Sequence, residues 1–426
     1  MSNTAPPLRL DRREFLSISG AVGAGAVFAT MSRCLARDAG KLDDPIERVT
    51  RSIIFPGRPR DDFKPDGKGV WFHPRACVVP TSDGPLGFMT VQRATGSDYF
   101  HPVCWTTSDD LGKTWSEPRP VPGMGREAYR DAIEAGVCDV VPEYHAPTDT
   151  VLAMGHNVFY TQGRFFRDQP PRWPVYSARD AAGNWTPLAR LEWNDPRGSQ
   201  IYTCGCSQRV TLADGDLLIA LSFGSTDRPD RRVTSVRCAF DGRKVTIKQT
   251  GSTLELRKKR GLLEPSLTQF EGRFWMTIRA EDDRAYVAVS DDGLQWSPQK
   301  AWTWDDGSPL VTSTTQQHWL AHADGLFLVY VRKAENNAKV FRWRSPLFLA
   351  RVDTRRMCLL RETERVVFPL VGDGVKKPKH VALMGNFHVN HATPRESWIT
   401  VGENLSNDGY AGDTLLARVR WKRPNR

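Results

Sequence analysis

Short apolar runs recur along the chain from about Ile53 onward, and Asp-Gly turns, similar glycine-containing turns and prolines separate them. The runs 217–221, 274–278 and 326–331 each follow such a turn. Hardly any stretch repeats its apolar residues at the spacing of a helix face. Short apolar runs bounded by turn residues are typical of buried strands, so the pattern predicts an all-β fold.

Some of the turns share a sequence motif. Residues 108–115 read Ser-Asp-Asp-Leu-Gly-Lys-Thr-Trp, residues 290–296 repeat this pattern one residue shorter, and residues 177–185 keep its Asp, Gly and Trp. In such a turn the Asp and Ser side chains bind backbone amides, the Gly takes a left-handed conformation and the Trp anchors the turn on the sheet. Copies several tens of residues apart predict a β-propeller. At roughly 60 residues per blade we expect six blades, with seven possible, over residues 45–424.

The chain has 426 residues, which is longer than a domain with a single hydrophobic core usually is. An architecture of repeated small sheets would account for this length. Lys and Arg outnumber Asp and Glu by 59 to 49, and the net charge of +10 favours an anionic partner. The basic residues are scattered, with short clusters only at 228–232 and 257–260. Because no continuous basic stripe is present, we expect no nucleic acid as the partner, whereas an acidic sugar and an anionic membrane both stay open.

The N-terminal residues 1–36 have the order of an export signal. Arg12 and Arg13 precede Phe15 and Leu16, and a weakly apolar stretch rich in Gly and Ala follows over 17–30. This order resembles a twin-arginine signal, with cleavage expected after Ala36, and predicts a periplasmic or extracellular protein. The apolar stretch is too short and too rich in glycine for a stable membrane span.

The cysteines do not predict a disulfide framework. The chain has eight, and removal of Cys34 with the signal would leave an odd number. Cys204 and Cys206 are separated by one residue, which is not a standard zinc-ligand spacing, and no second pair follows. We therefore expect free thiols, no metal ion and no cofactor.

With the turn motifs as a frame, the chain resembles the sialidase superfamily of Asp-box propellers over most of the region that follows the signal. The motif turns are structural in that superfamily, so their aspartates are not expected to be catalytic. The resemblance implies that Arg75, in the segment His-Pro-Arg-Ala, is the first of three substrate-binding arginines. It implies that Asp98, ten residues before Ser108, is the acid/base.

The segment 263–279 carries the most specific part of the resemblance. Glu264 and Arg279 have the separation and surroundings of the sialidase glutamate and second arginine, and Arg344 suits the third, with Arg342 or Arg332 as substitutes. Three arginines at one place would hold one carboxylate through charge-assisted, partly bidentate hydrogen bonds.

One element of the resemblance is missing. Sialidases have a tyrosine nucleophile that we would expect near residues 380–390, and this chain has no tyrosine between Tyr330 and Tyr410. Phe387 or His388 is expected to occupy the place, and His388 is the candidate to assist catalysis instead. Without the phenol, a covalent intermediate on tyrosine cannot form, so we expect an inverted anomer or an unsaturated product.

Further polar residues occur at expected strand ends or in turns, where propeller sites are assembled. The candidates for substrate binding are His156, Tyr202 and His318. The sequence thus predicts an exported, sialidase-like glycoside hydrolase that acts on a glycan containing sialic or uronic acid. A propeller-fold lyase acting on uronates and a non-catalytic glycan-binding propeller are the alternatives, and the oligomeric state is left open.

Overall fold

The computed structural model describes residues 43–60, 64, 66–228, 230–312, 315–407 and 409–425. The predicted export signal at 1–36 lies outside these residues. Among the residues described, no helix is both long enough and apolar enough to cross a membrane. Asp44–Arg426 forms one compact unit, and its strands run from Ile46 to Trp421.

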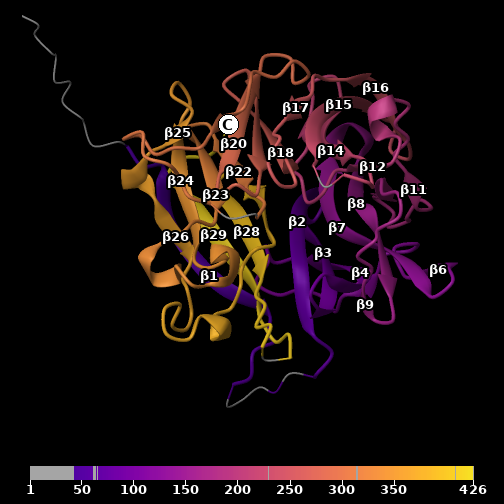
Figure 1. Cartoon of the computed structure of the whole chain (residues 1–426), viewed down its shortest axis with the longest axis horizontal. Helices are drawn as coiled ribbons and strands as arrows, with labels where there is room; N and C mark the ends of the chain where they lie inside the picture. The colour runs from indigo at the N-terminus through magenta and orange to yellow at the C-terminus, as the bar shows by residue number, and fades with distance from the viewer. Residues whose placement is uncertain are drawn as a thin grey trace, which may run out of the picture. The chain divides into compact units, whose positions relative to one another are not determined.

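The described residues form six antiparallel sheets, which are the blades of a β-propeller (Figure 1), so the predicted fold and blade number are confirmed. The first blade contains β2 (Val70–Thr81), β3 (Gly84–Gly96), β4 (Tyr99–Ser108) and β5 (Arg119–Pro120). The second contains β6 (Glu127–Arg130), β7 (Ile133–His145), β8 (Thr150–Thr161), β9 (Arg164–Phe165), β10 (Pro174–Asp180) and β11 (Ala189–Arg190). The third contains β12 (Ile201–Thr203), β13 (Val210–Thr211), β14 (Leu217–Gly224), β15 (Arg232–Phe240), β16 (Val245–Thr250) and β17 (Leu254–Glu255).

The other three blades complete the ring. The fourth contains β18 (Leu263–Phe270), β19 (Arg273–Arg279), β20 (Ala285–Ser290) and β21 (Lys300–Ala301). The fifth contains β22 (His318–His322), β23 (Gly325–Tyr330), β24 (Leu347–Asp353), β25 (Cys358–Leu359) and β26 (Arg365–Phe368). The sixth contains β27 (Phe387–Thr393), β28 (Glu396–Gly402), β29 (Thr414–Trp421) and β1 (Ile46–Phe55). Six short 3₁₀ helices lie in connections of the described chain: Ala146–Thr148, Pro196–Gly198, Glu335–Asn337, Phe341–Trp343, Arg361–Thr363 and Pro378–His380.

Strand β1 closes the ring. It pairs antiparallel with β29, from Ile46 opposite Trp421 to Phe55 opposite Thr414, and Figure 1 shows the first strand beside the last ones. The N-terminal strand thereby becomes the outer strand of the C-terminal blade. Closure of this kind leaves only short, protected sheet edges.

The motif turns join the third and fourth strands of their blades, and their side chains act as expected. Asp110 accepts hydrogen bonds from the amides of Lys113 and Thr114 at 2.9 Å, and the amide of Gly112 donates to Ser108 Oγ at 2.7 Å. Gly112 has a φ of +76°, which favours glycine. The Asp and Ser side chains of this turn thus satisfy its backbone amides.

Hydrophobic cores lie between adjacent blades. One buried cluster joins Val329 and Leu349 of the fifth blade to Val389 and Ile399 of the sixth. The tryptophans of the motif turns extend these contacts: the Trp115 ring packs edge-on against Trp398, with ring centroids 6.0 Å apart. Because each blade buries both faces against its neighbours, the inner strands are held in fixed positions around the axis.

The inner strands of neighbouring blades contact one another around the axis: β2 contacts β7 and β27, and β22 contacts β18 and β27. The side chain of Gln208 crosses between blades at this level. Its amide nitrogen donates to the carbonyl oxygens of Trp319 at 2.9 Å and Val389 at 3.2 Å, and its oxygen accepts from Trp319 N at 2.7 Å. Gln208 therefore ties the third, fifth and sixth blades together.

Candidate functional site

A cavity of about 400 Å³ lies where the inner strands begin, and charged side chains dominate its lining. Six arginines and four carboxylates line it: Arg172, Arg231, Arg260, Arg279, Arg342, Arg344, Asp98, Asp139, Glu264 and Glu281. We call it the arginine cavity. Its charges come from five blades of the propeller, so the assembled ring is needed to bring them together.

Left-handed backbone residues mark the wall of this cavity. His73, Asp139, Gly205 and Glu264 lie at the beginnings of four inner strand segments, line the cavity, and have φ values of +52°, +58°, +54° and +41°. The pairing of β2, β7 and β18 shifts register beside the three non-glycine residues. Such residues cost about 1–3 kcal/mol each and gather at functional sites. Asp98 and Arg342 also line the cavity with positive φ values, so five non-glycine residues in this conformation mark it as the candidate site.

The structure brings five of the predicted site residues to the arginine cavity: Asp98, His156, Glu264, Arg279 and Arg344. Asp98 stands in the turn between β3 and β4, with a φ of +53°. Glu264 and Arg279 form an ion pair across the paired strands β18 and β19. Of the two substitutes for the third arginine, Arg342 lines this cavity, whereas Arg332 pairs with Glu364 elsewhere in the fifth blade.

Arg75 lies beneath the cavity and does not line it. Its side chain is 1% exposed, and its Nη2 lies 2.5 Å from Asp139 Oδ1. His73, two residues earlier on β2, lines the cavity, and its Nε2 accepts a hydrogen bond from Asn386 Nδ2 at 2.8 Å. Of the three arginines expected to bind the substrate, Arg279 and Arg344 therefore line the cavity, whereas Arg75 binds Asp139; Arg342, named as a substitute, also lines the cavity.

Three predicted residues do not reach the arginine cavity. Tyr202 is buried between blades, and its hydroxyl donates to the carbonyl of Leu191 at 2.7 Å. The ring of His318 is buried beside His388, with ring centroids 5.3 Å apart. His388 instead lines a second cavity, of about 310 Å³, which contains residues further along the same inner strands; we call it the opposite cavity.

Phe387 or His388 was expected at the position of the sialidase tyrosine. Of these three neighbouring residues, Asn386 is the one that reaches the arginine cavity. Asn386 lines the arginine cavity, whereas Phe387 is fully buried in the core between the fifth and sixth blades. Successive side chains of a strand point to opposite faces, so a shift of one residue decides which one reaches the cavity. No tyrosine among the described residues lines the arginine cavity.

A tyrosine does lie in a neighbouring cavity of about 530 Å³. Tyr410 lines this cavity together with Asp98, Arg344 and Asn386, which also line the arginine cavity. Two cavities thus share the acid/base candidate and one arginine. No sequence motif indicated this position for Tyr410, because Tyr410 lies in the connection before the last strand.

The arginines at the cavity fall into two groups. Arg260 pairs with Glu281 at the cavity and Arg279 with Glu264, so these charges are balanced. Arg172, Arg231, Arg342 and Arg344 have no ion pair with any carboxylate in the part of the chain that the structure describes. Four guanidinium groups thus lack a carboxylate partner among the residues that the structure describes.

Arg344 shows the effect of this crowding most clearly. Burial, with Arg342 and Arg279 close by, lowers the pKa of Arg344 to about 10. Its Nε is buried and has no hydrogen-bond partner among the described residues. Gly385 makes room for it, since a Cβ there would lie 2.4 Å from Arg344 Nε. An anion in the cavity would supply the missing partner.

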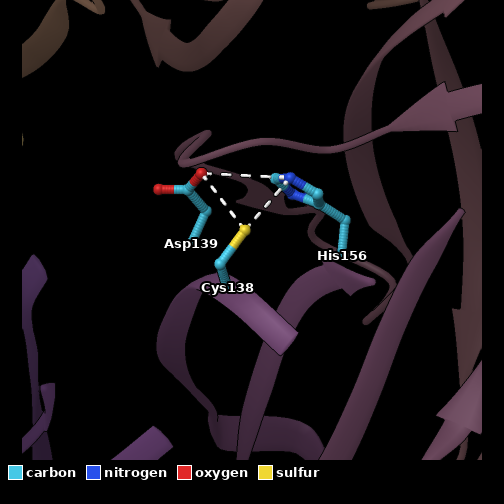
Figure 2. A group of neighbouring side chains, drawn as sticks. All are labelled: Cys138, Asp139 and His156. Carbon is cyan, nitrogen blue, oxygen red and sulfur yellow. Dashed lines mark hydrogen bonds and ion pairs between the residues drawn. The ribbon is translucent and has the colours of Figure 1, made fainter. Parts of the chain in front are cut away.

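The other side chains of the cavity floor are neutral or tightly held. Burial lowers the pKa of His73 and of His156 to about 3, so both imidazoles are uncharged at neutral pH. Burial alone would raise the pKa of Asp139, but Arg75 outweighs it and holds that pKa below its ordinary value. Figure 2 shows Cys138, Asp139 and His156 pointing toward one another at this floor.

Several residues of the site carried a weak sequence signal or none. Arg231 and Arg260 belong to the two short basic clusters. These clusters indicated an anionic partner but did not show that the two arginines would line this cavity. Asp139, His73 and Asn386 stand in no motif and become neighbours only because the blades close into a ring.

The comparisons with known proteins agree with the fold. No family model matches the chain, and no curated protein matches its sequence. Among solved structures, the Trypanosoma rangeli sialidase in complex with sialic acid is 13% identical with a TM-score of 0.59, covering 87% of this chain and 58% of the other. The NanB sialidase from Streptococcus pneumoniae is 10% identical with a TM-score of 0.56, covering 86% and 70%.

A third similar structure has no assigned function. It is a Dyadobacter fermentans protein, 15% identical with a TM-score of 0.60, and the match covers 88% of this chain and all of the other. The chain spans less than two thirds of the length of the T. rangeli sialidase. At these identities the likeness concerns the fold alone, and on that basis the chain has the six-bladed β-propeller fold of the sialidases.

Proposed function

We propose that the arginine cavity binds the acidic group of a sugar and that the protein is a sialidase-like glycoside hydrolase acting on a glycan that contains sialic or uronic acid. The observation that carries the proposal is the group of four arginines that have no carboxylate partner among the described residues, at a cavity that also holds Asp98 and Glu264. A carboxylate bound there would accept charge-assisted hydrogen bonds from planar guanidinium groups.

The chemistry we propose uses Asp98 as the proton donor to the leaving oxygen. Asp98 stands on the turn between β3 and β4 and lines both neighbouring cavities, so a sugar in one and its leaving group in the other would both lie near it. Since no tyrosine lines the arginine cavity among the described residues, water is the proposed nucleophile. Glu264, at the same cavity, is the proposed base that accepts the proton of this water while Asp98 protonates the leaving oxygen, and the product anomer is inverted.

A panel of acidic oligosaccharides tests the proposal. We expect release of a terminal acidic sugar, and NMR of the first product should show the inverted anomer. Absorbance from an unsaturated product would show a lyase instead. A retained anomer with an adduct on any tyrosine, Tyr410 included, would overturn the proposed mechanism.

A second candidate function is glycan binding without catalysis. It is favoured by one observation: Asn386, which is no nucleophile, stands at the start of the last inner strand where the sialidase resemblance calls for tyrosine. Binding of acidic oligosaccharides without release of any sugar would support it. Loss of both binding and release in the panel would reject both candidates.

We propose in addition that the protein works outside the cytoplasm. The support is the order of Arg12, Arg13 and the weakly apolar stretch after them. The double substitution Arg12→Lys and Arg13→Lys should leave the precursor in the cytoplasm, as measured by cell fractionation. Unchanged export of this variant would contradict the proposal.

A further inference from the structure

We infer that Cys138, Asp139 and His156 form a binding site for one transition-metal ion of the zinc type, at the floor of the arginine cavity. Figure 2 shows the three side chains converging, Cys138 and Asp139 from β7 and His156 from β8. The inference stands apart from the proposed function, because it concerns the binding of a metal ion and needs no sugar.

The distances between the three ligand atoms fit one bound ion. Cys138 Sγ lies 3.3 Å from His156 Nε2 and 3.8 Å from Asp139 Oδ2, and Nε2 lies 4.0 Å from Oδ2. A triangle with these sides has a centre about 2.2 Å from each corner, and zinc binds sulfur, nitrogen and oxygen at roughly 2.0–2.3 Å. An ion fits between the three atoms after shifts of a few tenths of an ångström, which bring Nε2 and Oδ2 closer together and let the ion leave the plane of the three ligands for a tetrahedral site.

The backbone of the second blade is built to bring these side chains together. Cys138 and His156 face each other as a pair on β7 and β8, so their side chains share one face of the sheet. Asp139 would normally point to the other face, but its φ of +58° and the register shift after Cys138 turn its carboxylate back toward the thiol. The same conformation lets the other carboxylate oxygen of Asp139 bind Arg75.

Gly155 makes this conformation possible. A Cβ at Gly155 would lie 2.4 Å from the carbonyl oxygen of Cys138 and 2.8 Å from a methyl group of Val140. Only glycine therefore fits opposite the shifted segment of β7.

The neighbours of the three residues leave their ligand atoms available. Arg75 binds Asp139 through Oδ1, so Oδ2 is left to face the ion. The hydrogen bond to Cys138 Sγ is the only one that the His156 ring makes among the described residues, although the ring is 5% exposed. His73 receives its hydrogen bond from Asn386 on Nε2 and points its other nitrogen, Nδ1, toward Asp139, 3.7 Å away. His73 and Arg75 thus hold the carboxylate from outside the ligand set.

The ligand types choose the ion. A thiolate with an imidazole suits zinc and similar metals, whereas calcium and magnesium take oxygen ligands. Binding releases the thiol proton of Cys138 to solvent, and the two negative ligands then balance a divalent ion. Three protein ligands leave a fourth position, and because all three line the arginine cavity this position opens to it. Water or an anionic group of a ligand can take that place.

Metal analysis of the full chain without its signal tests the inference, after purification without chelators and incubation with zinc. We expect about one zinc ion per chain. Cys138→Ser and His156→Gln should each weaken zinc binding by more than the roughly 10- to 100-fold that changes around a ligand set cause. Cys206→Ser is the matched control, because its thiol is also buried and lines the same cavity, and it should keep the full zinc content.

A second measurement does not depend on how well the variants fold. Cobalt added to the wild-type protein should give the near-ultraviolet charge-transfer band of a cobalt–thiolate bond, and this band should persist in Cys206→Ser. Wild-type protein that binds neither metal, or that binds cobalt without this band, would overturn the inference. Folded Cys138→Ser protein with the zinc content of the wild type would overturn it as well.

Discussion

The two cavities on the same inner strands differ in their backbone and in their charge. Six residues that line the arginine cavity have positive φ values, whereas no residue that lines the opposite cavity has one. The ion pair at the opposite cavity is complete: Arg209 Nε lies 3.4 Å from Glu143, and the amide of Arg209 donates to the same carboxylate at 3.0 Å. At the arginine cavity four guanidinium groups have no carboxylate partner among the described residues.

The difference teaches where this propeller carries its function. Regular strands with paired charges stabilise the ring and need no ligand. Left-handed residues and crowded arginines cost free energy in the folded protein, and they persist because the closed ring holds them in place. The arginine cavity has both the left-handed residues and the crowded arginines, so we expect this end of the axis to bind a ligand. Because the crowded side chains are positively charged, we expect that ligand to be an anion.

The largest effect is expected from a substitution at Asp98, which lines the arginine cavity and not the opposite cavity. Asp98→Asn should lower turnover of an acidic glycan by about 10²–10⁴-fold, the range of general acid–base catalysis, while affinity stays nearly constant because the amide has a similar shape. Steady-state kinetics and a binding measurement separate the two effects. Asp291→Asn is the control, since its side chain is 87% exposed, and it should keep full activity. Full activity of Asp98→Asn would remove Asp98 from the site.

The next effect concerns the arginines. Arg344→Lys replaces a planar fork by a point charge and should weaken binding of an acidic sugar by about 1–3 kcal/mol, measured by isothermal titration calorimetry. Arg332→Lys is the matched control from the same blade, because Arg332 pairs with Glu364 away from the cavity, and its affinity should equal that of the wild type. Equal losses in both variants would show that the effect comes from the fifth blade as a whole.

The strained backbone gives a prediction about stability. Gly155→Ala should lower the free energy of unfolding by about 1–3 kcal/mol, because the new methyl group overlaps the Cys138 carbonyl. In urea unfolding the control Gly125→Ala should change little, since a Cβ there meets no atom within 4 Å and its φ is not in the left-handed region. Equal stability of the two variants would mean that β7 does not need its irregular segment.

The smallest effect is expected from replacing Asn386, and replacing Asn390 in β27 serves for comparison. Asn386 lines the arginine cavity and donates to His73, whereas Asn390 lines the opposite cavity. Asn386→Ala should weaken binding of an acidic sugar by about 0.5–1.5 kcal/mol, the net value of one hydrogen bond. Asn390→Ala should leave the affinity unchanged. The reverse order of the two variants would place the sugar at the opposite cavity.

Local patterns in the sequence were sufficient for the fold and for part of the site. Turn motifs report on the residues beside them, so the copies at 108–115 and 290–296 predicted the blades and framed Asp98, Glu264 and Arg279. Each of these three side chains lies at the cavity. Their places follow from strand pairing within one blade or one turn.

The rest of the site depends on contacts between blades and on single-residue register, which a sequence does not display. Asp139 reaches the floor only because β7 shifts register beside it. Asn386 reaches the arginine cavity, whereas His388, two residues further along, lies at the opposite cavity. An error of two residues in the predicted register is therefore enough to select a side chain at the wrong cavity. Arg75 was predicted to bind the substrate, but the β2 side chain that lines the cavity is His73, two residues earlier.

A crystal structure of the protein with a bound sialic or uronic acid tests the central claim most directly. The account predicts the sugar in the arginine cavity, with its carboxylate within hydrogen-bonding distance of Arg344 and of at least one of Arg342 and Arg279. A sugar bound at the opposite cavity, or one in the arginine cavity whose carboxylate faces away from all three arginines, would contradict it.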